Sequence, residues 1–177
     1  MKKTCTLIIN LLFVVAIVAQ EKLPNPKIGK NEMEVSAFIF SDDKLVFGGE
    51  FVYRVSVKKK LKVGAGVLYG ADYAVLALPG IKDIDGYGAA FADIMLFGGH
   101  REKWCYGGQI GYGIFNDDKD PYYSSKTLGG IYYSISVNYR AIISKKLLLT
   151  NSLFIGYRNN VIGYFPSFLG LKAGIVF

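Results

Sequence analysis

The chain has 177 residues, of which 51% are hydrophobic and 15% aromatic, so a single domain with an extensive buried or lipid-covered surface is expected. The aromatic residues include 13 Tyr and 12 Phe, and 21 Gly occur without a collagen-like period, which favours strands and tight turns over helices. The formal net charge of +7 does not indicate nucleic-acid binding, because the basic residues lie mostly in short turns and not along one stripe. Two cysteines without Cys/His metal spacing also argue against a disulfide scaffold or a zinc site.

The N-terminal segment 1–20 predicts a cleaved secretory signal peptide. Lys2 and Lys3 precede an apolar run over residues 7–19, shorter than the roughly 17–25 residues of a membrane-spanning helix. The run ends in small residues suited to cleavage; the alternative is an uncleaved anchoring helix. Cleavage after Ala19 or Gln20 leaves 19 basic and 14 acidic residues, a net charge of +5. An irregular, proline-containing lead-in over 21–31 then precedes the domain at 32–177.

The rest of the chain divides into strand-length segments. Most reach or exceed the roughly 9–11 residues of a tilted membrane strand, whereas strands of soluble proteins average about five or six. Their length therefore favours a transmembrane barrel over a soluble sandwich. The eight predicted strands are 32–40, 45–57, 61–71, 86–97, 104–115, 127–142, 147–158 and 165–177.

The segments alternate between bulky apolar and small or polar residues, which is the period of a strand with two different faces. Over residues 134–137, for example, Ile135 and Val137 alternate with serines. Asn151 is an exception on the apolar face of 147–158. Because the polar faces are rich in glycine, they suit a narrow lumen better than a solvated surface. We therefore expect the bulky face to meet lipid and the lumen to hold Gly, Ser and paired charges.

The segment 86–97 is ambiguous, because keeping odd positions outward would expose Asp93 to lipid. We place Asp93 inward and Ala90, Ala92, Ile94 and Leu96 outward, which reverses the parity of the preceding strands. The expected lumen charges are Glu34, Glu50, Arg54, Lys62, Asp93, Arg140 and Lys172. Tyrosines expected in an interfacial belt are Tyr69, Tyr87, Tyr106, Tyr112, Tyr133, Tyr139 and Tyr157.

The connections alternate between two kinds. Those at 58–60, 98–103 and 143–146 are short and basic, whereas two of the others, 72–85 and 116–126, are long and acidic. Short turns on one side and long loops on the other match a bacterial barrel with both chain ends in the periplasm. The two long loops are expected to carry any recognition.

The segment 165–177, FPSFLGLKAGIVF, resembles the C-terminal strand signal of bacterial outer-membrane barrels. Its residues Leu171, Ala173, Ile175 and Phe177 form the apolar face. Together with the signal peptide, the alternating segments and the turn pattern, it makes the chain similar to the small outer-membrane barrels, the OmpA transmembrane domain and OmpX, over nearly all of the mature chain. No peptidoglycan-binding domain is expected after Phe177.

This resemblance implies an all-β fold, an eight-stranded antiparallel up-and-down transmembrane β-barrel in the bacterial outer membrane. Its partners would be outer-membrane lipid, lipopolysaccharide and, during insertion, the barrel assembly machinery. We expect a monomeric cell-envelope protein without a cofactor and with a structural, surface-interaction or minor porin-like transport role.

Enzymes also occur among such barrels, including lipid A acyltransferases and deacylases, omptin proteases and phospholipases, and their chemistry typically needs a histidine at the outer rim. The single histidine, His100, lies in a predicted periplasmic turn, so no enzyme is expected. Asp117, Asp118 and Asp120 could offer oxygen ligands, but the loop lacks the Gly and distal Glu of an EF-hand, and no metal site is assigned.

The lumen charges have two readings. They form either a network that plugs the barrel or the lining of a narrow conducting path; the small interior of eight strands favours the plug. A different alternative for the whole chain is a secreted, soluble, lipocalin-like barrel that binds an apolar ligand. The early Gly-x-Trp motif of lipocalins is missing, since Trp104 lies in the fifth segment.

Overall fold

The structure is a computed structural model that describes residues 31–41, 45–72, 86–98, 103–117, 126–144, 147–158 and 168–177. The predicted signal peptide, nearly all of the lead-in, and most of the two long loops lie outside these residues. Within them, the eight predicted strands are confirmed: β1 (Asn31–Ser41), β2 (Leu45–Lys58), β3 (Leu61–Asp72), β4 (Gly86–Gly98), β5 (Trp104–Asp117), β6 (Lys126–Ser144), β7 (Leu147–Arg158) and β8 (Phe168–Val176).

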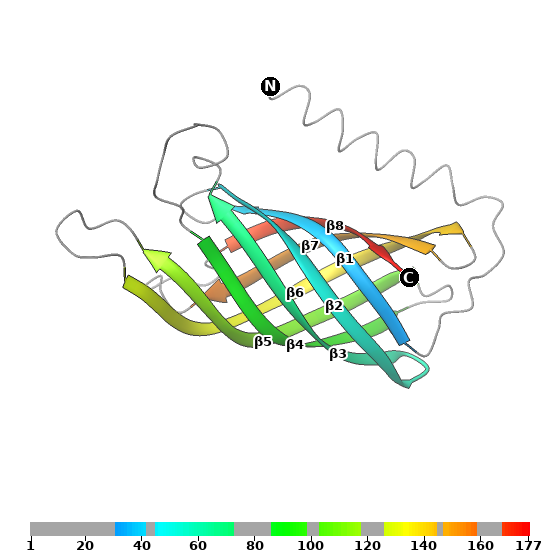
Figure 1. Ribbon diagram of the computed structural model, residues 1–177. Coiled ribbons are helices and arrows are strands. Elements are labelled where there is room, and N and C mark those ends of the chain that lie inside the picture. Colours follow the sequence, from blue (N-terminus) through cyan, green and yellow to red (C-terminus); the bar gives the residue numbers. More distant parts are fainter. Residues whose placement is uncertain are drawn as a thin grey trace, which may run out of the picture.

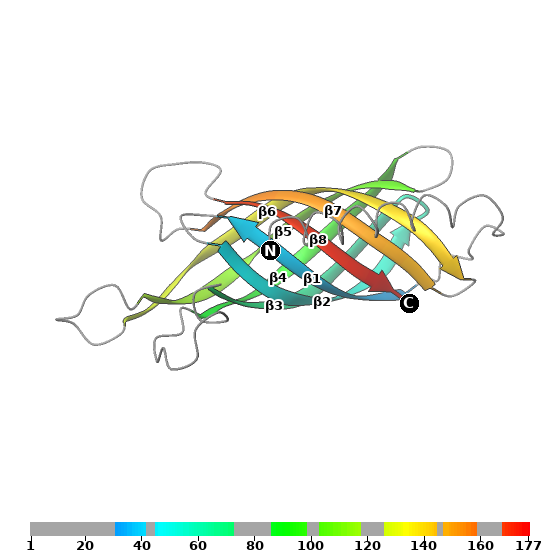
Figure 2. The ribbon, with the colours of Figure 1, turned by 90° about the horizontal axis from the view of Figure 1, so that it is seen from above.

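The strands form one closed antiparallel barrel in sequence order. Figures 1 and 2 show strongly tilted strands, with blue β1 beside red β8 at the closure. At one end of this seam Met33 and Phe177 exchange backbone hydrogen bonds of 2.8 and 3.0 Å. A closed sheet has no unpaired edge strand. The backbone N–H and C=O groups of each strand can therefore form their hydrogen bonds with neighbouring strands, without water.

Among the described residues, no helix is long and apolar enough to cross a membrane.

Large apolar side chains cover the outside of the barrel. Tyr69 and Ile110 are each 62% exposed, and Ile135 is 57% exposed. A soluble protein rarely exposes so continuous an apolar surface. The bulky faces of the strands therefore point outward. This confirms the prediction that was based on the many glycines of the opposite faces.

The parity reversal in β4 is also confirmed. Asp93 is buried inside the barrel, whereas Ala90, Ala92, Ile94 and Leu96 are exposed. The strand pairs with β3 through Ala92 and Ala65, both on the outer face. The apolar outer wall thus continues across β4 without a charge.

The expected tyrosine belt is wrong at one position. Tyr87 is only 3% exposed and belongs to the interior cluster. Tyr106 and Tyr112, by contrast, are well exposed on the outer face. Tyr87 has the inward parity of Asp93, so the reversal in β4 that keeps the charge out of lipid also turns this ring inward.

The expected lumen of Gly, Ser and paired charges describes only part of the interior. Large aromatic side chains fill the part nearer the long connections. These are Phe38, Phe40, Tyr87, Phe91, Tyr132, Phe154 and Phe168. Charged side chains occupy the middle and the part nearer the short turns, so the lumen has an aromatic half and a charged half.

Candidate functional site

The barrel interior is the candidate site, because the predicted charges converge there. All seven predicted side chains are buried within the barrel, and Glu32 at the start of β1 joins them. The charged half of the lumen thereby contains four carboxylates and four cations and is formally neutral. Its members are Glu32, Glu34, Glu50, Arg54, Lys62, Asp93, Arg140 and Lys172.

Arg54 is the centre of this network. Its Nε and Nη2 donate to the two carboxylate oxygens of Asp93 at 2.5 and 3.3 Å, and its Nη1 donates to Glu34 Oε2 at 2.5 Å. The side chain is 1% exposed. Because β2 is separated from β4 by β3, these contacts cross the lumen and join β1, β2 and β4. A planar guanidinium is suited to such a two-carboxylate site.

Glu32 organises a second group at the short-turn side. It receives two hydrogen bonds from Arg140, at 2.6 and 3.2 Å, and one from Lys62 at 2.5 Å. The ring of Phe97 lies against both cations, with centroid distances of 5.0 Å to Arg140 and 5.5 Å to Lys62. The prediction missed Glu32, although it shares the inward parity of Glu34.

Lys172 forms the third group, with Glu50 at 2.6 Å. This ion pair joins β8 to β2, across the intervening β1. Gln109 lies beside this pair, because its amide donates to Glu50 and to Asp93, both at 3.3 Å. This amide links the third group to Arg54 through Asp93.

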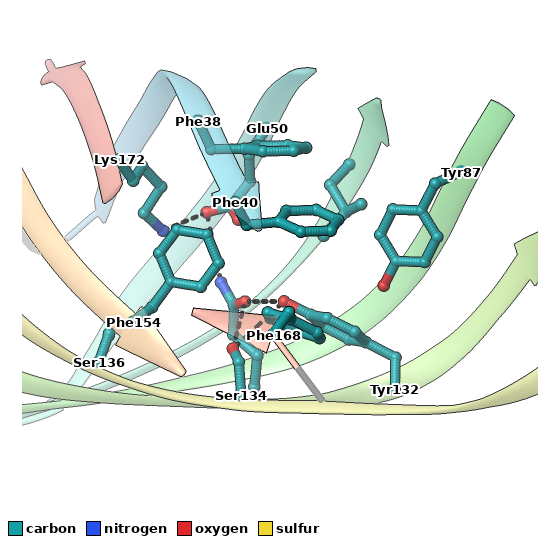
Figure 3. A pocket seen from close by; sticks show the side chains of 12 residues that line it. Phe38, Phe40, Glu50, Tyr87, Tyr132, Ser134, Ser136, Phe154, Phe168 and Lys172 are labelled. Carbon is teal, nitrogen blue, oxygen red and sulfur yellow. Dashed lines mark hydrogen bonds and ion pairs between the residues drawn. The ribbon is translucent and has the colours of Figure 1, made fainter. Parts of the chain in front are cut away.

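The aromatic half begins next to Gln109, on the side of the long connections. Tyr132 and Ser134 both donate to its Oε1, at 2.8 and 3.0 Å. Figure 3 shows the Tyr132 ring lying beside the ring of Phe168. These two rings stack with centroids 6.1 Å apart, and Phe40 lies 4.9 Å from Phe168. The cavity between the rings and the Glu50–Lys172 pair has a volume of about 10 Å³, room for about one water molecule.

Glycines make room for the inward rings. Gly66 faces Phe91 across β3 and β4, and Gly156 faces Phe168 across β7 and β8. A Cβ on Gly66 would lie 2.7 Å from a ring carbon of Phe91, closer than atoms pack. The rings therefore lie over bare backbone, and this is how a narrow barrel accommodates them.

The predicted assembly residues lie on β8 and just beyond it. Leu171, Ile175 and Phe177 are exposed on the outer wall, and Ala173 is half-buried there. Their part in assembly stays a prediction. His100, Asp118 and Asp120 lie outside the described residues, as does the side chain of Asp117. Within the described part of the chain, no group of three His, Cys, Asp or Glu side chains could hold a metal.

No family model matches the chain, and no curated protein sequence matches it. Solved structures do. The N-terminal β-barrel domain of Pseudomonas aeruginosa OprF is similar with a TM-score of 0.55 at 14% identity, covering 84% of this chain and 99% of that one. Neisserial surface protein A is similar with a TM-score of 0.55 at 10% identity, covering 82% and 94%. The chain therefore has the fold of the small eight-stranded outer-membrane β-barrels.

Proposed function

We propose that the protein is an integral, non-enzymatic β-barrel of the bacterial outer membrane, with a closed lumen and a structural or surface-interaction role. The reversed polarity of the barrel carries this proposal. Apolar side chains such as Val67 and Ile110 face outward, while Arg54 and its carboxylates face inward. In water this arrangement would expose the apolar surface and bury the charges, whereas in lipid both faces are satisfied.

A soluble carrier of the lipocalin kind fits the interior poorly. Such a protein needs an apolar cavity for its ligand, and ligand sites typically measure about 300–1,000 Å³. The cavity between the aromatic rings and the Glu50–Lys172 pair measures about 10 Å³. This volume favours a packed lumen over a ligand chamber.

The same packing supports a plugged lumen over a conducting path. Each of the three ion-paired groups joins strands that are not neighbours in the sheet, and the aromatic rings fill the space beyond them. An ion would have to displace Arg54 or Lys172 from carboxylates that they contact at 2.5 and 2.6 Å. Opening the path would leave these buried charges unpaired, which is costly.

We further propose the orientation and partners of the barrel. The basic short turns, including Lys58 to Lys60, face the periplasm, and the long acidic loops face outward, where they contact lipopolysaccharide. The outer face of β8, with Leu171, Ala173, Ile175 and Phe177, is recognised by the barrel assembly machinery. The finished barrel is monomeric.

The membrane proposal is tested by gel mobility. Protein extracted from outer membranes with detergent should run at different positions with and without boiling, because a closed barrel resists the denaturing detergent until heated. Protein that is soluble without detergent and shows no mobility change would contradict the proposal.

The plugged lumen is tested separately in planar bilayers. The folded barrel should give no steady ion current, because the charged and aromatic halves together fill the lumen. Steady single-channel steps would contradict a closed lumen while leaving the membrane location intact.

Wall polarity is tested by single cysteines on β6 in a Cys105→Ser background. Cysteines replacing Ile135 or Val137 should react with a lipid-soluble label, whereas those replacing Ser134 or Asn138 should not. The latter two side chains are 4% and 2% exposed inside the barrel. Labelling of both sets at the same rate would contradict the assignment of faces.

A further inference from the structure

Four neighbouring polar groups on the inner wall have no hydrogen-bond partner among the described residues. They are Glu34 Oε1, Ser36 Oγ, Arg140 Nε and Thr150 Oγ1. Each belongs to a side chain that is at most 4% exposed. A buried polar group without a partner is costly, and nearly all such groups in folded proteins bond to protein or to ordered water. Four of them in one place therefore require an explanation.

The four groups lie on one continuous stretch of the inner wall. Arg140 of β6 pairs in register with Thr150 of β7. Thr150 and Ser36 of β1 are both register partners of Gly174 on β8, one from each side. Glu34 comes two residues before Ser36 and is buried on the same face of β1. The register therefore places the four groups one after another, with Gly174 in the middle.

Gly174 leaves the centre of this stretch without a side chain. The strands that carry Ser36 and Thr150, β1 and β7, lie two strand spacings apart, about 10 Å. Ser36 leans across Gly174 toward β7, since a Cβ on Gly174 would lie 2.5 Å from the Cβ of Ser36. The two short hydroxyl side chains nevertheless do not bond to each other. A water molecule with a hydrogen bond of about 2.8 Å on either side closes a gap of this kind.

The chemistry of the four groups indicates which molecule fits between them. Arg140 Nε can only donate and Glu34 Oε1 can only accept, whereas the two hydroxyls can do both. These neighbours have complementary donors and acceptors, yet none bonds to another. The guanidinium disfavours a cation among them, and the carboxylate disfavours an anion. A small neutral molecule that both donates and accepts suits all four groups, and water is such a molecule.

We propose that the inner wall over Gly174 binds ordered water. The water bridges the hydroxyls of Ser36 and Thr150, donates to Glu34 Oε1 and accepts from Arg140 Nε. A few enclosed water molecules give no path for ions, so the lumen stays plugged. The proposal goes beyond the function proposed above and depends only on the closed barrel, so its failure would leave the membrane location intact.

This water also links two of the ion-paired groups. Glu34 accepts from Arg54 at 2.5 Å, and Arg140 donates to Glu32 at 2.6 Å. An ion pair of 3.6 Å between Arg54 and Glu32 connects these groups directly, but it is too long for a hydrogen bond. A water bridge from Glu34 to Arg140 adds a hydrogen-bonded connection between them.

A crystal structure of the folded, mature barrel, at a resolution that shows ordered water, tests the site directly. We expect a water molecule within hydrogen-bond distance of both Ser36 Oγ and Thr150 Oγ1. Thr150→Val should remove this water, whereas Thr150→Ser keeps the hydroxyl and should retain it. Direct bonds from the hydroxyls to Glu34 or Arg140, or a metal cation at this place, would overturn the proposal. The unmodified barrel suffices for this test if a variant does not fold.

Stability gives an independent test, because the sign of the effect differs between a hydrated and a dry site. Removing a hydroxyl that binds water breaks a hydrogen bond, whereas removing one without a partner is neutral or stabilising. Thr150→Val and Ser36→Ala should therefore each raise the equilibrium constant for unfolding in urea about fivefold, the ratio that corresponds to one net hydrogen bond. Unchanged or lower constants for both variants would contradict bound water.

A double variant tests whether the two hydroxyls share the water. Ser36→Ala with Thr150→Val should raise the unfolding constant by much less than the product of the single effects, because the first change already breaks the bridge. The matched control combines Ser36→Ala with Ser134→Ala. Since Ser134 donates directly to Gln109 at 3.0 Å, these two effects should multiply, to about 25-fold. Multiplication in both pairs would overturn the shared site.

Discussion

Replacing Arg54 by Met should destabilise the barrel more than any other single change in the charged half of the lumen. The variant keeps much of the side-chain volume but removes three hydrogen bonds to Glu34 and Asp93. Glu34 then has no hydrogen-bond donor among the described residues, and Asp93 keeps only the amide of Gln109 at 3.3 Å. Removing one partner of a buried ion pair typically costs about 3–5 kcal/mol. We expect a loss of that size in the free energy of unfolding.

The assay is urea unfolding of the barrel in lipid vesicles, followed by the fluorescence of Trp104, the one tryptophan of the chain. A combined variant, Arg54→Met with Glu34→Gln and Asp93→Asn, removes the unpaired charges and should recover more than half of the loss. Lys59→Met, in the exposed β2–β3 turn, is the control and should change the free energy by less than about 0.5 kcal/mol. A loss below about 1 kcal/mol for Arg54→Met, or a combined variant less stable than the single one, would refute the reasoning.

Three further outcomes are expected. Gly66→Ala should lower the free energy of unfolding by about 1–3 kcal/mol because the new Cβ meets the Phe91 ring, whereas Gly49→Ala, with no atom nearer than 3.7 Å, should not; equal effects would argue against the packing explanation. Cys105 is 0% exposed inside the barrel and should react with a maleimide only after boiling, so rapid labelling of the folded form would contradict a closed lumen. Phe177→Ala should slow the appearance of the heat-modifiable form in a pulse-chase experiment in cells, and an unchanged rate would remove the proposed assembly role.

The fold was predictable because most of its strands repeat the same period. Bulky residues at every second position, interrupted by short basic turns, define both the number of strands and the outward face. In β4 the cost of placing Asp93 in lipid was enough to choose the parity. The strand ends were less predictable, since β6 runs to Ser144, two residues beyond the expected end.

The membership of the charge network was predictable from parity, but its pairing was not. Its parity predicts that the side chain of Lys172 points into the lumen, but it does not predict which carboxylate binds it. The lumen is so narrow that Lys172 can reach carboxylates on strands other than its neighbours. Lys172 accordingly pairs with Glu50 on β2, 122 residues away in the chain. Glu32 was missed because the predicted strand began at that residue and the parity was read from Glu34 onward.

The aromatic half was missed because both faces of the strands are apolar there. In β1, inward Phe38 and Phe40 alternate with outward Ala37 and Ile39. Because all four residues are apolar, hydrophobicity does not distinguish the inner face from the outer one there. A signal was nevertheless present in the cross-strand register. Phe38 pairs with Gly48, Phe40 and Phe154 with Gly170, Phe91 with Gly66, and Phe168 with Gly156. Once the strands are aligned, an inward aromatic residue opposite a glycine marks a ring packed over backbone.

The division of the lumen into two halves determines how dissolved salt reaches the ion pairs. Mobile ions weaken the attraction between exposed charges over about 10 Å at 0.1 M salt, but they must be able to approach. From the long-connection end, the packed rings around Phe168 and Tyr132 stand in the way, and at the short-turn end the ring of Phe97 lies against Arg140 and Lys62. The charges that hold the strands together should therefore respond little to ionic strength, while those in the exposed turn at Lys58 to Lys60 respond fully. The free energy of unfolding of such a barrel should vary little with the salt concentration.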